Sequence, residues 1–365
     1  MSTDDGAGEP DATAGAAVEA GRHRDDAPRA GSGGVRRALA GLGVLVLVLA
    51  VLIGGGVWFL TDRYAGNIDR IADVFDDLDE NSRPAAPTPE QATAEDPVTF
   101  LLVGSDTRET SDEGVAEGGR SDAIMIARFA GDRRHAQLVS IPRDSWVDIP
   151  GHGRNKINAA YAFGGPTLLI QTVEQLTGVR IDHYVTIDFQ GIIQVTDDLG
   201  GVDVVVASET SNGPYTFPAG VNHLDGDQAR WYLGQRYGLE GGDFDRVRRQ
   251  QQFLKAMFTQ LFSSDTFTNP SRLDGALRAV TGNVAVDDSL SNTDLLSMAY
   301  SLRDLRPENV QSFTAPVLGT GQEGAASVVY LDTVTGERMW SYLRSDSLGA
   351  NAAEFDDEAL PDVPR

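Results

Sequence analysis

The chain contains no cysteine among its 365 residues. This absence excludes disulfide bonds, zinc sites built on thiolates, and thiol nucleophiles. The five histidines are scattered, and none of them falls in a metal-binding spacing such as HExxH. Chemistry based on sulfur, and the common histidine-based metal motifs, are therefore ruled out.

Positive charge is also scarce. The sequence has 30 Lys and Arg against 54 Asp and Glu, a formal net charge of −24, and Lys156 and Lys255 are its only lysines. A protein that binds nucleic acid needs a basic footprint for the phosphate backbone. We therefore expect no nucleic acid among its partners.

Three segments precede the expected folded domain. Residues 1–37 are rich in Gly, Ala, Asp, Glu and Arg and have almost no large apolar side chains, so we expect them to be disordered. Residues 38–60 carry no charge and are long enough for a transmembrane helix, whereas the apolar region of a secretory signal spans only about 7–15 residues. Residues 61–96 are expected to be a stalk or linker, which is rich in proline after Asn81.

The charges that flank the uncharged span are asymmetric. Arginines precede it and aspartates follow it: Arg22, Arg24, Arg29, Arg36 and Arg37 on one side, and Asp69, Asp73, Asp76, Asp77 and Asp79 on the other. Positively charged flanks stay on the cytoplasmic side of a membrane. We therefore expect a single-pass protein of the cell membrane with a cytoplasmic N-terminus and an extracellular C-terminal domain.

Residues 97–346 alternate between strand and helix patterns. Short apolar runs predict strands at 98–103, 121–127, 136–141, 184–187, 202–205 and 327–331. Apolar residues at helical spacing predict helices at 166–176, 190–199, 243–262, 271–280, 293–305 and 334–343. This alternation predicts an α/β fold, an α/β/α-type sandwich with a central mixed sheet. Residues 347–365 are expected to form a loose acidic tail.

The helix predicted to begin at Asp243 carries an unusual polar stripe. Positions three and four apart share one face of a helix, which places Asp243, Arg246, Arg249 and Gln250 together. Cations in the first turns oppose the helix dipole, which favours anions there. Guanidinium groups beside a carboxylate and an amide suit phosphate or pyrophosphate oxygens. The alternative is a solvated basic helix face.

Polar clusters also follow or precede several predicted strands, where sites in α/β folds are usually assembled. Asp106 and Asp122 offer the oxygen ligands that Mg²⁺ uses beside waters and phosphates. Arg120, Arg143 and Lys156 add positive charge nearby. Each cluster by itself also fits ordinary turn chemistry, but together with the polar stripe they indicate a site for a phosphorylated substrate.

Five motifs, in order, resemble the LytR-CpsA-Psr family of cell-wall proteins. The resemblance covers residues 98–343, and the last of the five motifs is Asp243-Phe-Asp-Arg-Val-Arg-Arg-Gln250. The other four are Phe100-Leu-Leu-Val-Gly-Ser-Asp-Thr-Arg108, Gly119-Arg-Ser-Asp122, Ser140-Ile-Pro-Arg-Asp-Ser145 and Lys156-Ile-Asn-Ala-Ala-Tyr161.

The resemblance implies a Mg²⁺-dependent phosphotransferase. Such an enzyme moves an anionic glycopolymer (teichoic acid, arabinogalactan or capsule) from a polyprenyl pyrophosphate carrier to peptidoglycan, at the primary hydroxyl of N-acetylmuramic acid. It also implies an apolar cavity for the prenyl tail. By motif, the metal ligands are Asp106 and Asp122; the catalytic residues are Arg143, Arg236, Asp243 and Arg246; and the substrate-binding residues are Arg120, Lys156, Arg249 and Gln250.

The sequence departs from the family at one position. The family usually carries Arg-x-Arg before the central helix, and here the stretch is Gly234-Gln-Arg236. The missing cation can mean reduced activity, a different polymer, or compensation by Arg248 or Arg249. Alternatively, Gly234 allows close backbone packing and Arg236 is a surface cation.

Three other functions compete with the transferase. Water can replace the sugar hydroxyl, which would make the protein a polyprenyl-pyrophosphate hydrolase or give the transferase a pyrophosphatase side activity. A non-catalytic module that binds the lipid carrier or the cell wall is the second. A transcriptional regulator is the third, and both the net charge and the expected membrane orientation oppose it.

Overall fold

The computed structural model describes residues 68–85, 96–105, 121–235, 238–239, 243–261, 274–275, 278 and 281–359. All of them belong to one compact unit, residues 57–365. The expected disordered segment 1–37 and the expected membrane span 38–60 lie outside the described residues. Within the described ranges, no helix is both long and apolar enough to cross a membrane.

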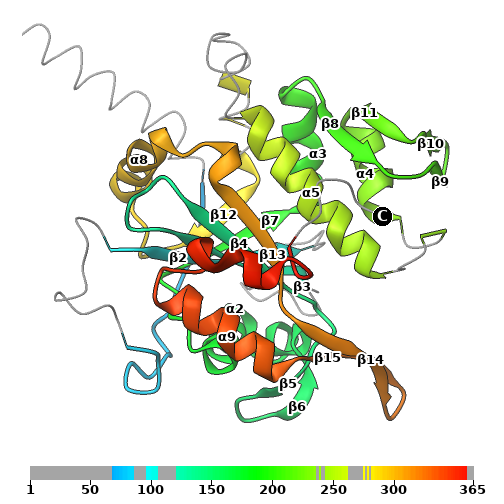
Figure 1. Ribbon diagram of the computed structural model, residues 1–365. Helices are drawn as coiled ribbons and strands as arrows, with labels where there is room; N and C mark the ends of the chain where they lie inside the picture. The colour runs from blue at the N-terminus through cyan, green and yellow to red at the C-terminus, as the bar shows by residue number, and fades with distance from the viewer. Residues whose placement is uncertain are drawn as a thin grey trace, which may run out of the picture. The chain divides into compact units, whose positions relative to one another are not determined.

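A mixed seven-stranded sheet forms the centre of the unit, in the order β1-β12-β7-β2-β3-β4-β13 (Figure 1). Its strands are β1 (Asp69–Ile71), β2 (Val98–Ser105), β3 (Ser121–Phe129), β4 (Ala136–Ile141), β7 (His183–Asp188), β12 (Val284–Asp287) and β13 (Val310–Thr314). Strand β2 runs parallel to β7 and antiparallel to β3. The predicted central mixed sheet is confirmed.

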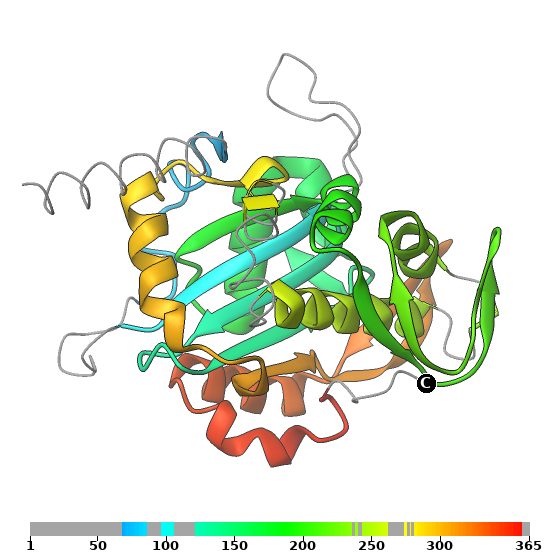
Figure 2. The ribbon, with the colours of Figure 1, turned by 90° about the horizontal axis from the view of Figure 1, so that it is seen from above.

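Both faces of the sheet are covered, as the side-chain alternation of β2 requires. Leu101 and Val103 point into a core that also contains residues of α2 (Asn158–Thr177) and α9 (Thr333–Arg344). Phe100 and Leu102 belong to the opposite core, with residues of α8 (Asn292–Ser301). Figures 1 and 2 show these helices on the two sides of the sheet. The α/β/α arrangement is therefore confirmed.

Helix α2 begins earlier than its apolar pattern indicated. A kink at Gly164 and Gly165 divides it, and Pro166 opens the longer second part. Proline is tolerated there because the first turn of a helix leaves its N–H groups unpaired. Gly178, with φ at +62°, ends the helix in the left-handed conformation that glycine adopts easily.

A second apolar cluster lies beyond the end of β7. It is built by residues of α3 (Phe189–Asp198), β8 (Val202–Val206), β10 (Tyr215–Phe217), β11 (Gly220–Leu224), α4 (Gly226–Gly234) and α5 (Asp243–Leu261). Strand β9 (Thr210–Asn212) pairs with β10. Buried Tyr232 and Phe253 bring α4 and α5 together in this cluster, and Ile187 of β7 packs against it. The helices predicted at 190–199 and 243–262 are confirmed, and α4 is a further helix that the sequence analysis did not predict.

Several short elements were not anticipated. They include the hairpin β5 (Trp146–Ile149) with β6 (Gly153–Lys156), the strand β14 (Val317–Glu323) and the 3₁₀ turn η3 (Pro307–Asn309). Strand β14 pairs with β15 (Ala326–Leu331), which confirms the strand predicted at 327–331. The helix predicted at 293–305 is confirmed as α8, and its last turn is the 3₁₀ turn η2 (Leu302–Asp304). Most of the helix predicted at 271–280 lies outside the described residues.

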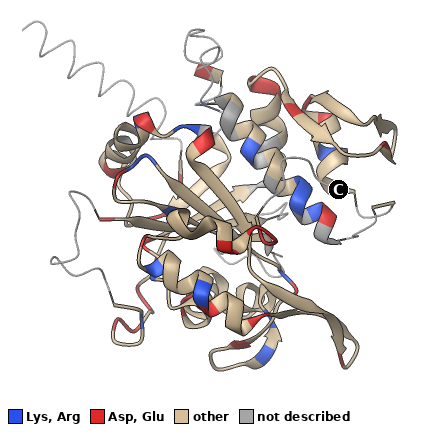
Figure 3. Cartoon of the chain, in the orientation of Figure 1, with Lys and Arg blue, Asp and Glu red and all other residues tan. Residues whose placement is uncertain are grey.

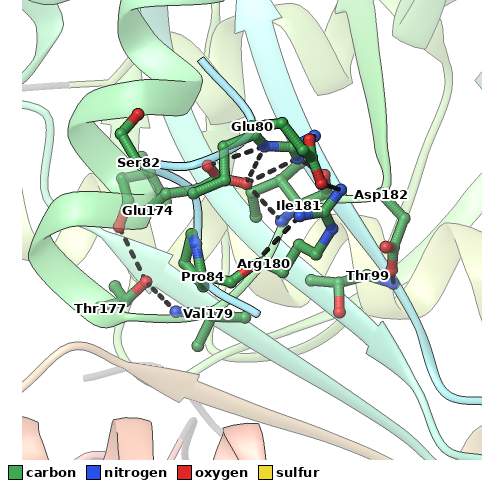
Figure 4. A network of polar contacts seen from close by, with 12 residues as sticks. Glu80, Ser82, Pro84, Thr99, Glu174, Thr177, Val179, Arg180, Ile181 and Asp182 are labelled. Atoms are coloured by element: carbon green, nitrogen blue, oxygen red, sulfur yellow. Dashed lines mark hydrogen bonds and ion pairs between the residues drawn. The ribbon is translucent and has the colours of Figure 1, made fainter. Parts of the chain in front are cut away.

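The predicted stalk is wrong for residues 69–85, because this stretch belongs to the folded unit. Strand β1 pairs with β12 at the edge of the central sheet, and Val74 is buried in the core. Farther on, Arg83 binds Glu174 of α2 through two nitrogens, Nε to Oε2 at 3.1 Å and Nη2 to Oε1 at 2.8 Å. Figure 4 shows this network around Glu174. The folded domain therefore begins before the proline-rich linker.

The predicted loose tail is wrong for residues 349–359. A 3₁₀ helix, η4 (Gly349–Phe355), places Phe355 in the main core. The backbone N–H of Thr314 then donates to the Glu358 carbonyl at 2.8 Å, and Ala359 bridges to Phe313. The acidic composition obscured this docking, since a single buried aromatic residue and a few backbone bonds hold the segment.

Candidate active site

Strand ends that carry the motifs meet at one edge of the sheet. Ser105, the last residue of β2, is in register with Ser121, the first residue of β3, and with Asp188, the last residue of β7. On the other side of β3, Ile124 pairs with Ile141, where β4 ends. The motifs around Asp106, Asp122 and Arg143 therefore start or end at the same edge, as the sequence indicated.

Of the two proposed metal ligands, the structure describes only the backbone of Asp122. Asp122 is the second residue of β3, but its side chain, like the whole of Asp106 and Arg120, lies outside what the structure describes. Among the described residues, no group of three or more His, Asp or Glu side chains could hold a metal ion. The magnesium site therefore stays a prediction.

Arg143, Asp144 and Lys156 form a partly buried charged cluster beside this edge. Asp144 Oδ1 lies 2.9 Å from Lys156 Nζ, and its Oδ2 lies 3.8 Å from Arg143 Nε. The sequence placed both cations in the site, and the structure adds Asp144 as the carboxylate that holds them together. Guanidinium and ammonium groups held in this way beside a carboxylate suit the oxygens of an anionic substrate.

Backbone hydrogen bonds hold this cluster in place. The Asn158 N–H donates to the Arg143 carbonyl at 3.2 Å, and the Val329 N–H donates to the Asp144 carbonyl at 2.9 Å. Strand β15 and the beginning of α2 thus fix the loop from opposite sides. A rigid loop keeps charged side chains in place without the entropy loss of ordering them at binding.

The polar stripe of α5 is buried. Arg246 and Arg249 are 3% and 4% exposed, and Gln250 is buried as well. Figure 3 shows the basic residues of α5 gathered toward the beginning of the helix. The alternative of a solvated basic face is therefore wrong. Asp243 is the first residue of α5, and its side chain is outside the described part of the molecule.

Arg249 has a different environment from the one predicted for a substrate ligand. Its Nη1 donates to Gln235 Oε1 at 2.7 Å, and its guanidinium carbon lies 4.7 Å from the centroid of the Tyr232 ring. Burial lowers the pKa of this guanidinium. Gln235, which the sequence did not single out, therefore connects α5 with the segment that precedes Arg236. No periodic or charge pattern marks an isolated buried glutamine, so this contact was not predictable.

Gly234, which stands where the family usually carries an arginine, is surrounded by open space. Gly234, the last residue of α4, is exposed, and a Cβ added to it would meet no atom within 4 Å. Its φ angle is not positive, so its backbone is not in the left-handed region. The alternative in which Gly234 allows close backbone packing is therefore wrong. Arg236 lies outside the described residues.

Known proteins resemble this chain in sequence and in fold. Residues 70–345 match the LytR_cpsA_psr family. "Cell wall biosynthesis protein LcpA" of Corynebacterium glutamicum is 32% identical over 73% of this chain and 59% of its own length. "Polyisoprenyl-teichoic acid--peptidoglycan teichoic acid transferase TagU" of Bacillus cereus is 30% identical over 78% of this chain and 89% of its own length.

A solved structure, "TagT bound to LI-WTA", superimposes with a TM-score of 0.55 at 26% identity, and the match covers 73% of this chain and 95% of that one. The chain spans about 60% of the corynebacterial relative that it matches. The family match itself covers most of the chain and coincides with the central sheet and the helices around it. This protein belongs to the LytR_cpsA_psr family.

Proposed function

We propose that this protein is a phosphotransferase that attaches an anionic glycopolymer from a polyprenyl pyrophosphate carrier to peptidoglycan, at the primary hydroxyl of N-acetylmuramic acid. The observation that carries the proposal is the meeting of β2, β3, β4 and β7 at one sheet edge, beside the Arg143–Asp144–Lys156 cluster. The printed names of the relatives in Corynebacterium glutamicum and Bacillus cereus support it, since they refer to cell wall biosynthesis and teichoic acid transfer.

The residues suit the chemistry of this reaction. Displacing one phosphoryl group of a pyrophosphate requires charge neutralisation and positioning more than covalent help from the protein. Arg120, Arg143, Arg236 and Arg246 would hold the phosphate oxygens, with Lys156 and Gln250 beside them. Asp243 would orient the acceptor hydroxyl. In this scheme the hydroxyl oxygen of muramic acid bonds to the phosphorus that carries the polymer, and the bond from that phosphorus to the bridging oxygen of the pyrophosphate breaks. The prenyl phosphate leaves with the bridging oxygen, and the hydroxyl proton is lost to solvent.

Mg²⁺ fits the donor set that the motifs provide. Asp122, the second residue of β3, directly follows Ser121, which pairs with Ser105 at the end of β2, and Asp106 follows Ser105 in the sequence. Carboxylate oxygens are the ligands that Mg²⁺ takes beside waters and phosphates. Bound there, the ion would supply charge neutralisation to the pyrophosphate.

We further propose that residues 38–60 anchor the protein in the cell membrane, with the N-terminus inside and the domain outside. The support is the uncharged span with its arginine-rich N-terminal flank. Protease added to intact spheroplasts is expected to remove the domain. Protection of the domain, together with loss of an N-terminal tag, would reverse the orientation.

The test of the transferase assignment uses the full chain in detergent micelles. A polyprenyl-pyrophosphate-linked glycopolymer is supplied with Mg²⁺, with and without uncrosslinked peptidoglycan glycan strands. We expect polymer bound to the glycan strands, in amounts equal to the prenyl phosphate released. Free polymer phosphate released equally with and without the glycan would favour the hydrolase, and release of neither product would favour a binding module.

Restoring the missing cation is expected to raise activity. Gly234→Arg places a second guanidinium two residues before Arg236, and the open surroundings of Gly234 accommodate it. The change should also be tolerated by the fold, because arginine is a better helix former than glycine by up to about 1 kcal/mol and its charge suits a helix end. Steady-state rates and melting temperatures check this. A lower rate in a variant with an unchanged melting temperature would contradict it.

A further inference from the structure

Strand β15 lies against β5 beside the charged cluster of the candidate active site (Figure 1). Ser145 and Val329 pair in the parallel direction, and their side chains are only 0% and 7% exposed. Because side chains alternate across a strand, the next residues, Trp146 and Tyr330, lie side by side on the opposite, outer face. Both of these side chains are half-buried. Two aromatic residues are therefore presented together next to the cluster.

The hairpin β5–β6 continues this arrangement toward the cluster itself. Trp146 is paired with Lys156, and residues directly opposite each other in an antiparallel pair point to the same face. Lys156 Nζ in turn lies 2.9 Å from Asp144 Oδ1. Neighbouring strands are about 4.8 Å apart. Tyr330, Trp146 and Lys156 thus form a row across β15, β5 and β6 that ends at the cluster, and we call it the aromatic row.

The ring of Tyr330 is held in place by β14. A Cβ added to Gly321 would meet Tyr330 Cε2 at 2.5 Å, so the ring lies directly against this glycine. The Tyr330 hydroxyl donates to Glu323 Oε1 at 2.8 Å. This hydrogen bond raises the pKa of Tyr330, and the charge of Arg154 acts on the hydroxyl in the opposite direction. The ring is therefore fixed at both ends, with Arg154 close enough for its charge to be felt.

Charges of both signs surround the aromatic row. Arg154 and Asp148 are opposite each other on the hairpin, and both are exposed. Lys156 is paired with a carboxylate, and Glu323 is exposed beside Tyr330. A repeating polyanion needs a surface of one positive sign. Sugar rings, which have apolar C–H faces, amide groups and scattered carboxylates, instead fit aromatic side chains with mixed charges around them.

We propose that the aromatic row binds the acceptor glycan strand of peptidoglycan and leads it to the charged cluster. The inference rests on the proposed function and names the surface that receives its acceptor. Sugar rings would stack on Trp146 and Tyr330, and Arg154 would pair with a carboxylate of the strand. Continuity with the site supports this occupant, because the row ends at Lys156, where the acceptor hydroxyl must reach the phosphate.

The test separates the KM for the acceptor from the KM for the donor. It uses the full chain in detergent micelles, with soluble uncrosslinked peptidoglycan glycan strands and the polyprenyl-pyrophosphate-linked donor. Tyr330→Ala is expected to raise the KM for the strands by roughly five- to tenfold, the effect of losing one stacked ring. Gly321→Ala keeps the tyrosine but displaces its ring, and a rise of roughly threefold is expected because the stacking geometry is disturbed. Calorimetry with the strands alone should show matching increases in Kd.

Arg154→Gln provides a second variant, since the residue is exposed and the change leaves the fold intact. Strand binding is expected to weaken by roughly threefold and to depend less on salt, because an exposed charge pair is screened by ions. The matched control is Tyr300→Ala, which removes a 69% exposed tyrosine of α8, on the other face of the central sheet. Both KM values should stay within about twofold there, as for most surface changes.

The outcomes are distinct. Unchanged KM and Kd for the strands in Tyr330→Ala and Arg154→Gln would overturn the inference, and so would equal losses in Tyr300→Ala. A rise in the donor KM alone would mean that the aromatic row holds the polymer of the donor, which also overturns it. If the unaltered protein binds the strands through the row but transfers no polymer to them, the proposed function fails instead.

Discussion

Arg83→Met is expected to lower the free energy of unfolding by about 3–5 kcal/mol, the usual effect of breaking a buried ion pair. Arg83 and Glu174 have side chains that are 8% and 4% exposed, and two nitrogens of Arg83 bind the carboxylate. With Arg83 gone, the Glu174 charge would be buried without its partner. The loss would also detach the segment that precedes the linker from α2. Urea titration of the full chain in detergent, followed by circular dichroism, measures the change.

The matched control is Glu80→Ala in the same network. Glu80 pairs with Arg180 at 2.6 Å and with Arg83 at 3.5 Å, but its side chain is 65% exposed, and solvent-exposed pairs contribute little to stability. Equal effects of Arg83→Met and Glu80→Ala would contradict the prediction. Arg83→Met combined with Glu174→Met should recover only part of the loss. The recovery is incomplete because Glu174 accepts from the Ile181 N–H at 2.9 Å and Arg83 donates to the Ile181 carbonyl.

Asp122→Asn is expected to reduce transferase turnover by roughly a hundredfold or more, because a catalytic metal supplies several kcal/mol of charge stabilisation. Asparagine has nearly the same shape as aspartate, so β3 should be retained while the ligand charge is lost. Turnover is measured against Mg²⁺ concentration with the full chain, and Mg²⁺ binding in the presence of inorganic pyrophosphate is measured by calorimetry. Both the rate and the binding are expected to fall.

Asp203→Asn provides the control for this substitution. Asp203 lies on β8, is exposed, and contacts His223 at 2.7 Å. Its replacement should leave turnover within about twofold, as surface changes usually do. An unchanged rate in Asp122→Asn, or full activity of the unaltered protein in chelator, would remove Asp122 from the site and magnesium from the reaction.

The sequence by itself determined most of the secondary structure and the placement of the motifs. Short apolar runs marked β2, β3 and β4, and helical spacing marked α5 to within a residue of its observed end. Both patterns are local, since side chains alternate across a strand and repeat along a helix regardless of the rest of the chain. The polar residues at the strand ends also pointed to one edge of the sheet. The register of β2 with β3 and β7 agrees with this expectation.

Only the tertiary structure decided which distant residues meet. Strand β1 is three residues long, and it is a strand because β12, more than two hundred residues later, offers a partner. Arg83 is buried because the folded chain brings it to Glu174, which lies 91 residues later in the sequence. Gln235 matters because Arg249 and Thr210 surround it. A single hydrogen bond or ion pair contributes little to local propensity, so it leaves no periodic signal in the sequence. Its energy depends on burial, and burial exists only once the chain has folded.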